Sequence, residues 1–361
     1  MRRILFLLIL LCLIGPRTAF PAKNAGKLAV KSALVTEYGS GRTLYSQDAD
    51  RQIPPASLTK VMTMYVVFDL VASGKASFAD RVKVSRNADR TGGSTMGLRA
   101  GEVVTLDELM RGMAVASGND ACIAVAEHFG GVPAFVGLMN RKARELGMTG
   151  TTFKNPNGLP AAGQFTTARD LTKLAVSYLR HYPQALRYHS TTEINHNGAV
   201  HGNTNRLLGS YDGADGIKTG YVDASGYNII ATAKRGDTRV IAVVLGGRTK
   251  QVRNREAVRI LDASFSGAVQ TMVAACDMPE PEQPAKSLSK RGSSKRHAKA
   301  MHIAKAERHA KVSARSGASA RFDAHDATTK KSRKAGKAGK APAAKTAQKK
   351  PSGKAKHVAS R

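Results

Sequence analysis

Strand patterns stand at both ends of the foldable part of this chain, with helical patterns between them, and this arrangement limits its folds. Residues 28–46 alternate between apolar and polar positions and break at Gly39-Ser40-Gly41, which predicts a hairpin. Residues 226–247 contain two β-rich runs around Arg235-Gly236-Asp237, which predicts a second hairpin. Strands at both ends favour the α+β class, with one antiparallel sheet covered by helices. The strands that pair need not be neighbours in sequence.

Six segments between and after these strands carry helical patterns. Thr105 and Glu108 form a capping box, and Pro133 stands at a first-turn position. The first segment begins at Ser57 and leaves no wide polar face, so we expect it to be buried inside the domain. The predicted helices are 57–71, 105–116, 121–129, 133–146, 166–182 and 254–265.

The N-terminus has the pattern of an export signal. Arg2 and Arg3 precede an apolar run from Ile4 to Ile14, which is too short to cross a bilayer as a helix. We therefore expect a signal peptide over residues 1–22 and an exported protein of the periplasm or cell envelope. The pattern does not define the cleavage site, so an uncleaved segment that tethers the chain to the membrane stays an alternative.

Most of the chain's net charge of +31 belongs to its C-terminal part. Residues 281–361 contain 23 Lys and Arg against four acidic residues, a net of +19. Residues 277–361 have too few large apolar side chains to form a core, so we expect a disordered basic tail. Such a tail binds polyanions. In an exported protein these are anionic envelope surfaces, and nucleic acid is not an expected partner.

The segment "PPASLTKVMTMYVVFDLV" places Ser57 three residues before Lys60 in an almost wholly apolar run. Positions i and i+3 of a helix share a face, so both side chains would reach the same cavity. A serine hydroxyl is a weak nucleophile without a base beside it, and a lysine is a base only after it loses its proton. Burial or a second cation lowers the pKa of a lysine in that direction. The alternative is a helix-capping Ser57 with an exposed Lys60.

The spacing of this pair is weak by itself, because Ser287 and Lys290 repeat it in the tail. A second motif, Ser117-Gly118-Asn119, falls in the break between two predicted helices, where a hydroxyl and an amide can face a cleft. The rival Ser-x-Asn at residues 85–87 lacks that setting. The alternative for residues 117–119 is a plain turn.

A third motif, Lys218-Thr219-Gly220, occurs once and directly precedes the strand "GYNIIATA". A cation and a hydroxyl at a strand edge, with a glycine that permits close approach, suit the carboxylate of an extended peptide. The alternative is the start of a surface strand. The order and the settings of the three motifs make coincidence the weaker explanation.

These motifs match Ser-x-x-Lys, Ser-x-Asn and Lys-Thr-Gly, the set found in penicillin-recognising serine enzymes. Blocks such as "PPASLTKVMT", "ASGNDACIAVAEHFGG" and "GADGIKTGYVDASGYNIIATA" closely resemble the D-alanyl-D-alanine carboxypeptidases of the low-molecular-weight penicillin-binding proteins, peptidase family S11. The resemblance covers residues 25–266. It implies a serine β-lactamase/D,D-peptidase-like domain over that range.

The resemblance also implies a role for each motif residue. Ser57 would be the acylated nucleophile, and Lys60 would take its proton. Ser117 and Asn119 would complete proton transfer and hold the substrate backbone. Lys218 and Thr219, with Gly220 beside them, would bind the terminal carboxylate. Arg253, or the nearby Arg248, would help to hold the same carboxylate. The backbone N–H groups of Tyr221 and Ser57 would form the oxyanion hole.

The implied activity is a serine-type D-Ala-D-Ala carboxypeptidase that removes terminal D-alanine from peptidoglycan pentapeptides through an acyl-enzyme. Its implied partners are peptidoglycan stem peptides and β-lactam antibiotics, with penicillins as covalent inhibitors. A D,D-endopeptidase stays an alternative. A class A-like β-lactamase is another, but that class needs a glutamate to activate the deacylating water, and residues 153–170 contain none. Many family members continue into a small β domain and an amphipathic membrane helix, where this chain has its basic C-terminal residues.

No metal or organic cofactor is expected. The three cysteines, Cys12, Cys122 and Cys276, match no zinc-site spacing. Cys122 lies in a helical apolar pattern, so we expect it in the core. Nothing in the pattern supports a bridge between Cys122 and Cys276.

Overall fold

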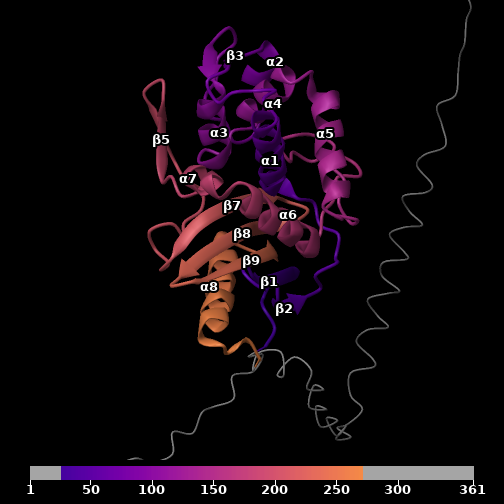
Figure 1. The fold of residues 1–361 in the computed structure, drawn as a ribbon, viewed down its shortest axis with the longest axis vertical. Coiled ribbons are helices and arrows are strands. Elements are labelled where there is room, and N and C mark those ends of the chain that lie inside the picture. The colour runs from indigo at the N-terminus through magenta and orange to yellow at the C-terminus, as the bar shows by residue number, and fades with distance from the viewer. Residues whose placement is uncertain (1–25, 271–361) are drawn as a thin grey trace, which may run out of the picture. The chain divides into compact units, whose positions relative to one another are not determined.

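The strands predicted at the two ends of the chain pair with one another in the computed structural model, which describes residues 26–270 (Figure 1). Five antiparallel strands form one sheet in the order β2-β1-β9-β8-β7. The first strand of the chain therefore pairs with the last, and the predicted α+β fold is confirmed. The strands are β1 (Ser32–Glu37), β2 (Thr43–Gln47), β7 (Ala214–Val222), β8 (Gly226–Arg235) and β9 (Thr238–Gly247).

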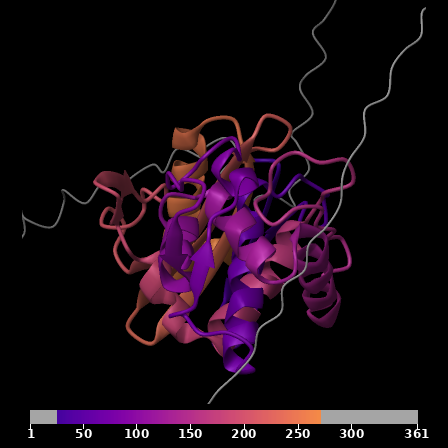
Figure 2. The same cartoon turned by 90° about the horizontal axis from the view of Figure 1, so that it is seen from above.

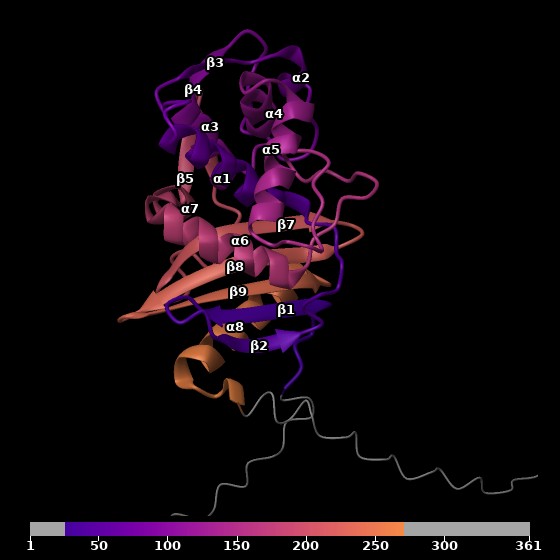
Figure 3. The same ribbon diagram turned by 45° about the vertical axis from the view of Figure 1, so that its right-hand side comes forward.

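Both faces of the sheet are covered by helices, because successive side chains of each strand point to opposite sides. In β9, Val243 and Leu245 belong to the core shared with α6 (Ala168–His181), while Val244 belongs to the core shared with α8 (Lys250–Ser266). Helix α6 crosses one face and α8 packs on the other (Figure 3). The sheet is thus a middle layer, and the buried part of its strand β9, from Val240 to Leu245, is wholly apolar.

Helix α1 (Thr59–Ala72) lies among the other elements of the domain (Figure 2). All its residues from Thr59 to Phe68 are buried. The predicted absence of a polar face is therefore confirmed. Helices α3, α5 and α6 contact α1 from different sides. The helices of this layer are α2 (Arg86–Asp89), α3 (Leu106–Ala114), α4 (Asn119–His128) and α5 (Val132–Glu145).

Two predicted helix starts are confirmed by their capping residues, whereas α8 begins at Lys250, four residues before its predicted start. Thr105 and Glu108 form both hydrogen bonds of the capping box at the start of α3, and Pro133 stands in the first turn of α5. Cys122 is a free, buried thiol in α4. Residues 1–22, 277–361 and Cys276 lie outside the described residues, so the predictions for them stay predictions.

Several short elements carried no sequence signal, since three or four residues show no periodicity. They are the 3₁₀ turns η1 (Ala56–Leu58) and η2 (Pro183–Ala185), the helix α7 (Leu186–His189), and the pairs β3 (Arg81–Lys83) with β4 (Val103–Thr105) and β5 (Glu193–His196) with β6 (Ala199–Gly202). Within residues 26–270, no single helix has the length and apolar character of a membrane span. Helices α4 and α5 pass that test only together, and they are bent by 95° at their junction.

Lys218-Thr219-Gly220 precede the strand "GYNIIATA", as predicted. The sequence did not show that they belong to a strand of their own, β7, whose residues pair with β8. Strand β7 is an edge of the five-stranded sheet. One side of its backbone is therefore not paired within this sheet, which is the geometry needed to accept an added peptide strand.

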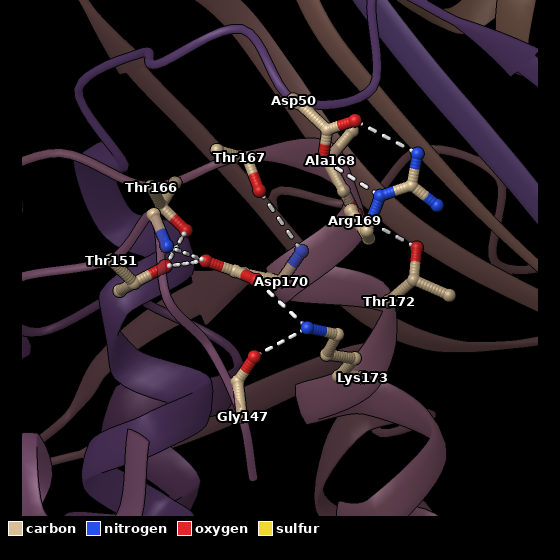
Figure 4. A network of polar contacts seen from close by, with 11 residues as sticks. Asp50, Gly147, Thr151, Thr166, Thr167, Ala168, Arg169, Asp170, Thr172 and Lys173 are labelled. Carbon is tan, nitrogen blue, oxygen red and sulfur yellow. Dashed lines mark hydrogen bonds and ion pairs between the residues drawn. The ribbon is translucent and has the colours of Figure 1, made fainter. Parts of the chain in front are cut away.

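A network around Asp170, at the start of α6, fastens the loop before it (Figure 4). The buried Asp170 carboxylate accepts hydrogen bonds from Gly150 N at 2.8 Å and Thr151 Oγ1 at 2.8 Å. Arg169, the preceding residue, pairs with Asp50 on the surface at 2.7 and 2.9 Å. The two carboxylates differ in their access to water. Water can take the place of the exposed Asp50 carboxylate if it is lost, but not that of the buried Asp170 carboxylate.

The same region anchors the chain that leads to Ser57. Ile53 N donates to Thr166 O at 2.8 Å, and Thr166 N donates back to Ile53 O at 2.9 Å. Thr166 Oγ1 is also within 2.9 Å of Thr151 Oγ1. The Asp170 network is therefore connected, through Thr166, to a position four residues before Ser57.

Replacement of Asp170 by alanine should lower the free energy of unfolding by about 2 kcal/mol, because the partly buried N–H of Gly150 and hydroxyl of Thr151 lose a buried charged acceptor. Asp50→Ala is the matched control. It removes a carboxylate whose side chain is 70% exposed, so it should change stability little. Urea unfolding of both variants measures the difference; equal effects would contradict this account of the network.

Candidate active site

Ser57 and Lys60 are placed together at the start of the central helix. Ser57 lies in the η1 turn that follows Pro54 and Pro55, and Lys60 lies in the first turn of α1. The Lys60 Nζ is 3.0 Å from Ser57 Oγ. Ser57 is half-buried and Lys60 is fully buried. The alternative of an exposed Lys60 is therefore wrong, and the two side chains meet as their spacing indicated.

The amine of Lys60 has three hydrogen-bond partners and none of them is a carboxylate. Besides Ser57 Oγ, they are Asn119 Oδ1 and the carbonyl oxygen of Asn157, both at 2.7 Å. A neutral amine keeps two N–H donors and gains a lone pair. It can therefore donate to Asn119 and Asn157 and accept the Ser57 hydroxyl proton.

Burial lowers the pKa of Lys60, and the Cys122 thiol and the Asp120 carboxylate oppose that effect only in part. Removal from water disfavours the charged form of an amine, because the charge loses its hydration. The lowered pKa and the hydrogen bonds lead to the same conclusion. Lys60 is suited to act as a base toward Ser57.

Asn119 has a fixed orientation. Its Nδ2 donates to Gly92 O at 2.7 Å, so its Oδ1 must face Lys60. Its own backbone N–H donates to Ser94 O at 2.7 Å. Ser117 lies in the break before α4, as predicted, whereas Asn119 is already the first residue of that helix. The Ser117 backbone has a φ of 59°, a left-handed conformation that a serine adopts at a cost.

Asp120, which the motif reading passed over, holds the loop opposite this break. Its buried carboxylate accepts hydrogen bonds from the backbone N–H groups of Met96, Gly97 and Leu98 at 3.0–3.1 Å. This fixes residues 94–98 against the start of α4. Ser94 thereby comes to line the site.

Strand β7 passes directly beside Ser57. A Cβ added to Gly220 would lie 3.0 Å from Ser57 N and 3.2 Å from Leu58 N, so a side chain there would push the strand away from the nucleophile. The predicted need for a glycine at this position is thus explained. The next residue outward, Thr219, donates from Oγ1 to Thr204 Oγ1 at 2.9 Å.

Lys218 lies behind the strand. It is 1% exposed, and its Nζ donates to the Thr219 carbonyl oxygen at 3.2 Å. Burial lowers its pKa well below the usual range, and the charge of Lys60 lowers it further. Lys218 is therefore a second lysine near Lys60, the kind of neighbour that the sequence analysis considered. It does not line the open cavity, and it lies beneath Thr219.

Arg253 reaches the same place from α8. It is 4% exposed, and its Nη1 donates to Asn228 O at 3.0 Å while its Nε donates to Asn254 Oδ1 at 2.7 Å. Burial lowers its pKa to about 10. Arg248, the alternative, is exposed and does not line the cavity. The geometry therefore favours Arg253.

A cavity of about 430 Å³ opens onto these groups. The predicted residues Ser57, Ser117, Thr219, Gly220, Tyr221 and Arg253 line it, whereas Lys60, Asn119 and Lys218 support it from behind. The lining residues that the sequence reading missed are Ser94, Gly202, Asn203, Thr204, Arg206, Tyr227, Lys250 and Asn254. Among residues 26–270, no group of three or more His, Cys, Asp or Glu side chains could hold a metal ion.

The antiparallel sheet with a serine and a buried lysine under its edge strand places the chain in the class of D,D-peptidase and β-lactamase-like folds. The chain belongs to the D-alanyl-D-alanine carboxypeptidase family, peptidase S11, whose model matches residues 18–249. The carboxypeptidase DacF of Bacillus subtilis (strain 168) is 40% identical over 258 residues, which are 70% of this chain and 65% of that relative. This chain thus spans less than two thirds of that relative's length.

Two solved structures show the same likeness. Penicillin binding protein 6B from Escherichia coli is 35% identical with a TM-score of 0.64, and the match covers 69% of this chain and 80% of that chain. Penicillin-Binding Protein D2 from Listeria monocytogenes, in its ampicillin-bound form, is 32% identical with a TM-score of 0.61. That match covers 66% of this chain and 98% of the Listeria protein.

Replacement of Lys60 by methionine should slow acylation of Ser57 by a penicillin by at least about 10²-fold, the usual contribution of general base catalysis. The unmodified protein should acylate faster as pH rises through the pKa of Lys60, which lies below 10.5, since the neutral amine is the base. The variant should lack this pH limb.

Lys75→Met, which removes an exposed lysine, is the control and should behave as the unmodified chain. Rates are measured by mass spectrometry of the intact protein. An unchanged rate and pH profile in Lys60→Met would rule out Lys60 as the base.

Proposed function

We propose that this chain is a serine-type D-Ala-D-Ala carboxypeptidase that removes the terminal D-alanine from peptidoglycan pentapeptides through an acyl-enzyme on Ser57. The observation that carries the proposal is the 3.0 Å contact between Ser57 Oγ and the buried amine of Lys60. Family membership supports the same reaction. Neither a lone hydroxyl nor a charged lysine would supply the nucleophile that this chemistry needs.

Acylation begins when Lys60 takes the proton of Ser57. The Ser57 oxygen then attacks the carbonyl carbon of the penultimate D-alanine, and a C–O bond forms. The negative oxygen that develops is stabilised by the backbone N–H groups of Ser57 and Tyr221. The C–N bond breaks, and the leaving D-alanine nitrogen receives the proton from Lys60 by way of the Ser117 hydroxyl.

The substrate is held as an added strand along β7. The unpaired edge of this strand supports the proposal, because an extended peptide can hydrogen-bond along it. The terminal carboxylate then lies near Thr219 and Arg253, with the charge of Lys218 beneath them. Three cationic or hydroxyl donors at one point favour a carboxylate over a neutral amide.

Deacylation uses water, with Lys60 again as the base, and returns Ser57 to its free form. No acidic side chain is among the described residues that line the cavity, and residues 153–170 contain no glutamate. A penicilloyl group, which keeps its leaving amine attached by the ring, should therefore leave slowly. This favours a penicillin-inhibited peptidase over a class A-like β-lactamase. The D,D-endopeptidase alternative uses the same reaction and differs only in the leaving group, which is larger than a single D-alanine.

A penicillin should modify Ser57 covalently and persist there, as intact mass and peptide mapping would show. A pentapeptide that ends in D-Ala-D-Ala should release one D-alanine per molecule. The Listeria relative is described in an ampicillin-bound form, so the penicillin-treated chain can be compared with it directly. Absence of labelling on folded protein would overturn the proposal, and rapid turnover of nitrocefin would replace it by a β-lactamase.

We also propose that the chain is exported and that its basic C-terminal residues bind anionic surfaces of the cell envelope. The sequence supports this through the N-terminal export pattern and the net charge of +19 over residues 281–361. Binding through such charge is expected to weaken steeply with salt, because it depends on counterion release.

Deletion of residues 281–361 should reduce the binding of the protein to anionic lipid vesicles at low salt, while peptide hydrolysis in solution stays the same. Sedimentation with vesicles of graded anionic lipid content, at two salt concentrations, measures the effect. Equal sedimentation of the full and the shortened chain would contradict a role for this charge.

A further inference from the structure

Two cations line the cavity in addition to Arg253, and the proposed carboxypeptidase reaction uses neither. They are Arg206 and Lys250, and both are exposed. Within the part of the chain that the structure describes, neither forms an ion pair with an acidic side chain, whereas arginines such as Arg169 and Arg187 do. All charged side chains that line the cavity are therefore positive.

Arg206 is held in place by buried neighbours on both sides. Exposure alternates along this segment: Asn203, Asn205 and Leu207 are buried, and Thr204 and Arg206 face the cavity. Asn203 Nδ2 donates to Thr191 O at 2.8 Å, and Asn205 Nδ2 donates to Gly216 O at 3.2 Å. These side chains clamp the backbone, so Arg206 projects from a fixed base.

Lys250 is fixed in a different way. It is the first residue of α8, whose N-cap Thr249 accepts a hydrogen bond from Val252 N at 3.1 Å. Arg253 stands three residues later, on the same side of the helix, and both line the cavity. No acidic side chain occurs in the first turn of α8. Lys250 therefore adds its charge just outside that of Arg253.

The place of these cations relative to the reaction follows from their neighbours. Thr219 and Arg253 are proposed to hold the terminal carboxylate, which belongs to the leaving D-alanine. Arg206 is two residues from Thr204, the hydrogen-bond partner of Thr219, and Lys250 is one turn from Arg253. Both cations thus flank the carboxylate position, on the leaving-group side of the scissile bond.

We propose that Arg206 and Lys250 form a second carboxylate subsite, for leaving groups that carry another acidic group besides the carboxylate next to the scissile amide. This inference rests on the proposed function. A single D-alanine cannot use the subsite, because its one carboxylate is bound already. The amine component of a peptide cross-link can, since it is itself an acidic peptide.

The reaction is the same acyl transfer with a larger leaving group. The Ser57 oxygen bonds to the D-alanyl carbonyl carbon, the bond from that carbon to the amide nitrogen breaks, and the nitrogen takes the proton that left Ser57. The acidic amine leaves at this stage. Water then hydrolyses the ester, which frees the D-alanyl peptide and returns the Ser57 hydroxyl. The subsite thereby extends the peptidase from terminal residues to cross-links.

Two synthetic peptides test the subsite through charge alone. They share one acyl donor and end in D-Ala-D-Glu or D-Ala-D-Gln, so the leaving residues have the same shape and differ by one negative charge. The unmodified chain should show a kcat/KM about five- to tenfold higher for the D-Glu peptide, since exposed ion pairs are modest in strength. The double variant Arg206→Gln/Lys250→Gln should bring the ratio close to one.

The control Lys75→Gln/Lys83→Gln removes two exposed cations that do not line the cavity, and it should keep the preference. The measured quantity is the ratio, so a uniform change of activity in a variant does not affect the conclusion. A ratio near one in the unmodified chain, or a preference that survives Arg206→Gln/Lys250→Gln, would overturn the subsite. An equal fall of the ratio in the control would show general attraction between a basic protein and an anion, and would overturn it too.

Failure of the proposed function gives a different set of results from failure of the subsite alone. Penicillin labelling of Ser57 is scored on the same samples and shows that each variant is folded. If labelling and turnover of all peptides are both absent in the unmodified chain, the acyl-transfer function and the subsite fall together. If labelling and D-alanine release are present without charge preference, only the subsite falls.

Discussion

The site depends on an amine that is kept out of water without a carboxylate to neutralise it. Lys60 is fully buried, and its three partners are a hydroxyl, an amide oxygen and a backbone carbonyl oxygen. In such surroundings the charged form loses its hydration and gains no full counter-charge, so the neutral form is favoured. This explains why α1 must be the central helix of the domain. On a surface helix the same Ser57 and Lys60 would be a hydrated cation beside an inert alcohol.

The groups around this amine are held by backbone that is under strain. Ala56 and Ser117 both have positive φ angles, of 50° and 59°, which cost roughly 1–3 kcal/mol each for residues with a side chain. The first lies beside a close backbone approach: a Cβ on Gly158 would lie 1.8 Å from Ala56 O, so only a glycine fits against the turn that carries Ser57. The Asp120 carboxylate braces the loop that faces the second. The strain therefore positions the reacting oxygen in advance.

The sequence predicted the parts of this structure that repeat or that carry side-chain chemistry. The hairpins and the long helices showed periodicity, and Ser57, Lys60, Ser117 and Asn119 stood in motifs whose order was informative. Asn157 could not be found that way, because its contribution is a backbone carbonyl oxygen, which any residue has. Ser94 and Thr204 reach the cavity only through loops fixed by Asp120 and by buried asparagines. The burial of Lys218 within an edge strand depends on the packing of α7 and η1, which have no sequence signal.

Under the proposed function, the two buried lysines connect substrate binding to the chemistry. Burial lowers the pKa of Lys218, and Lys60 lowers it further when its amine is protonated, since Coulomb repulsion between two cations is mutual. A carboxylate placed near Thr219 and Arg253 favours the protonated form of Lys218. A protonated Lys218 in turn disfavours a proton on Lys60, which leaves the amine free to accept one from Ser57. The acidic end of the peptide thereby prepares the base before the carbonyl is attacked, and a ligand without that carboxylate loses more than one ion pair.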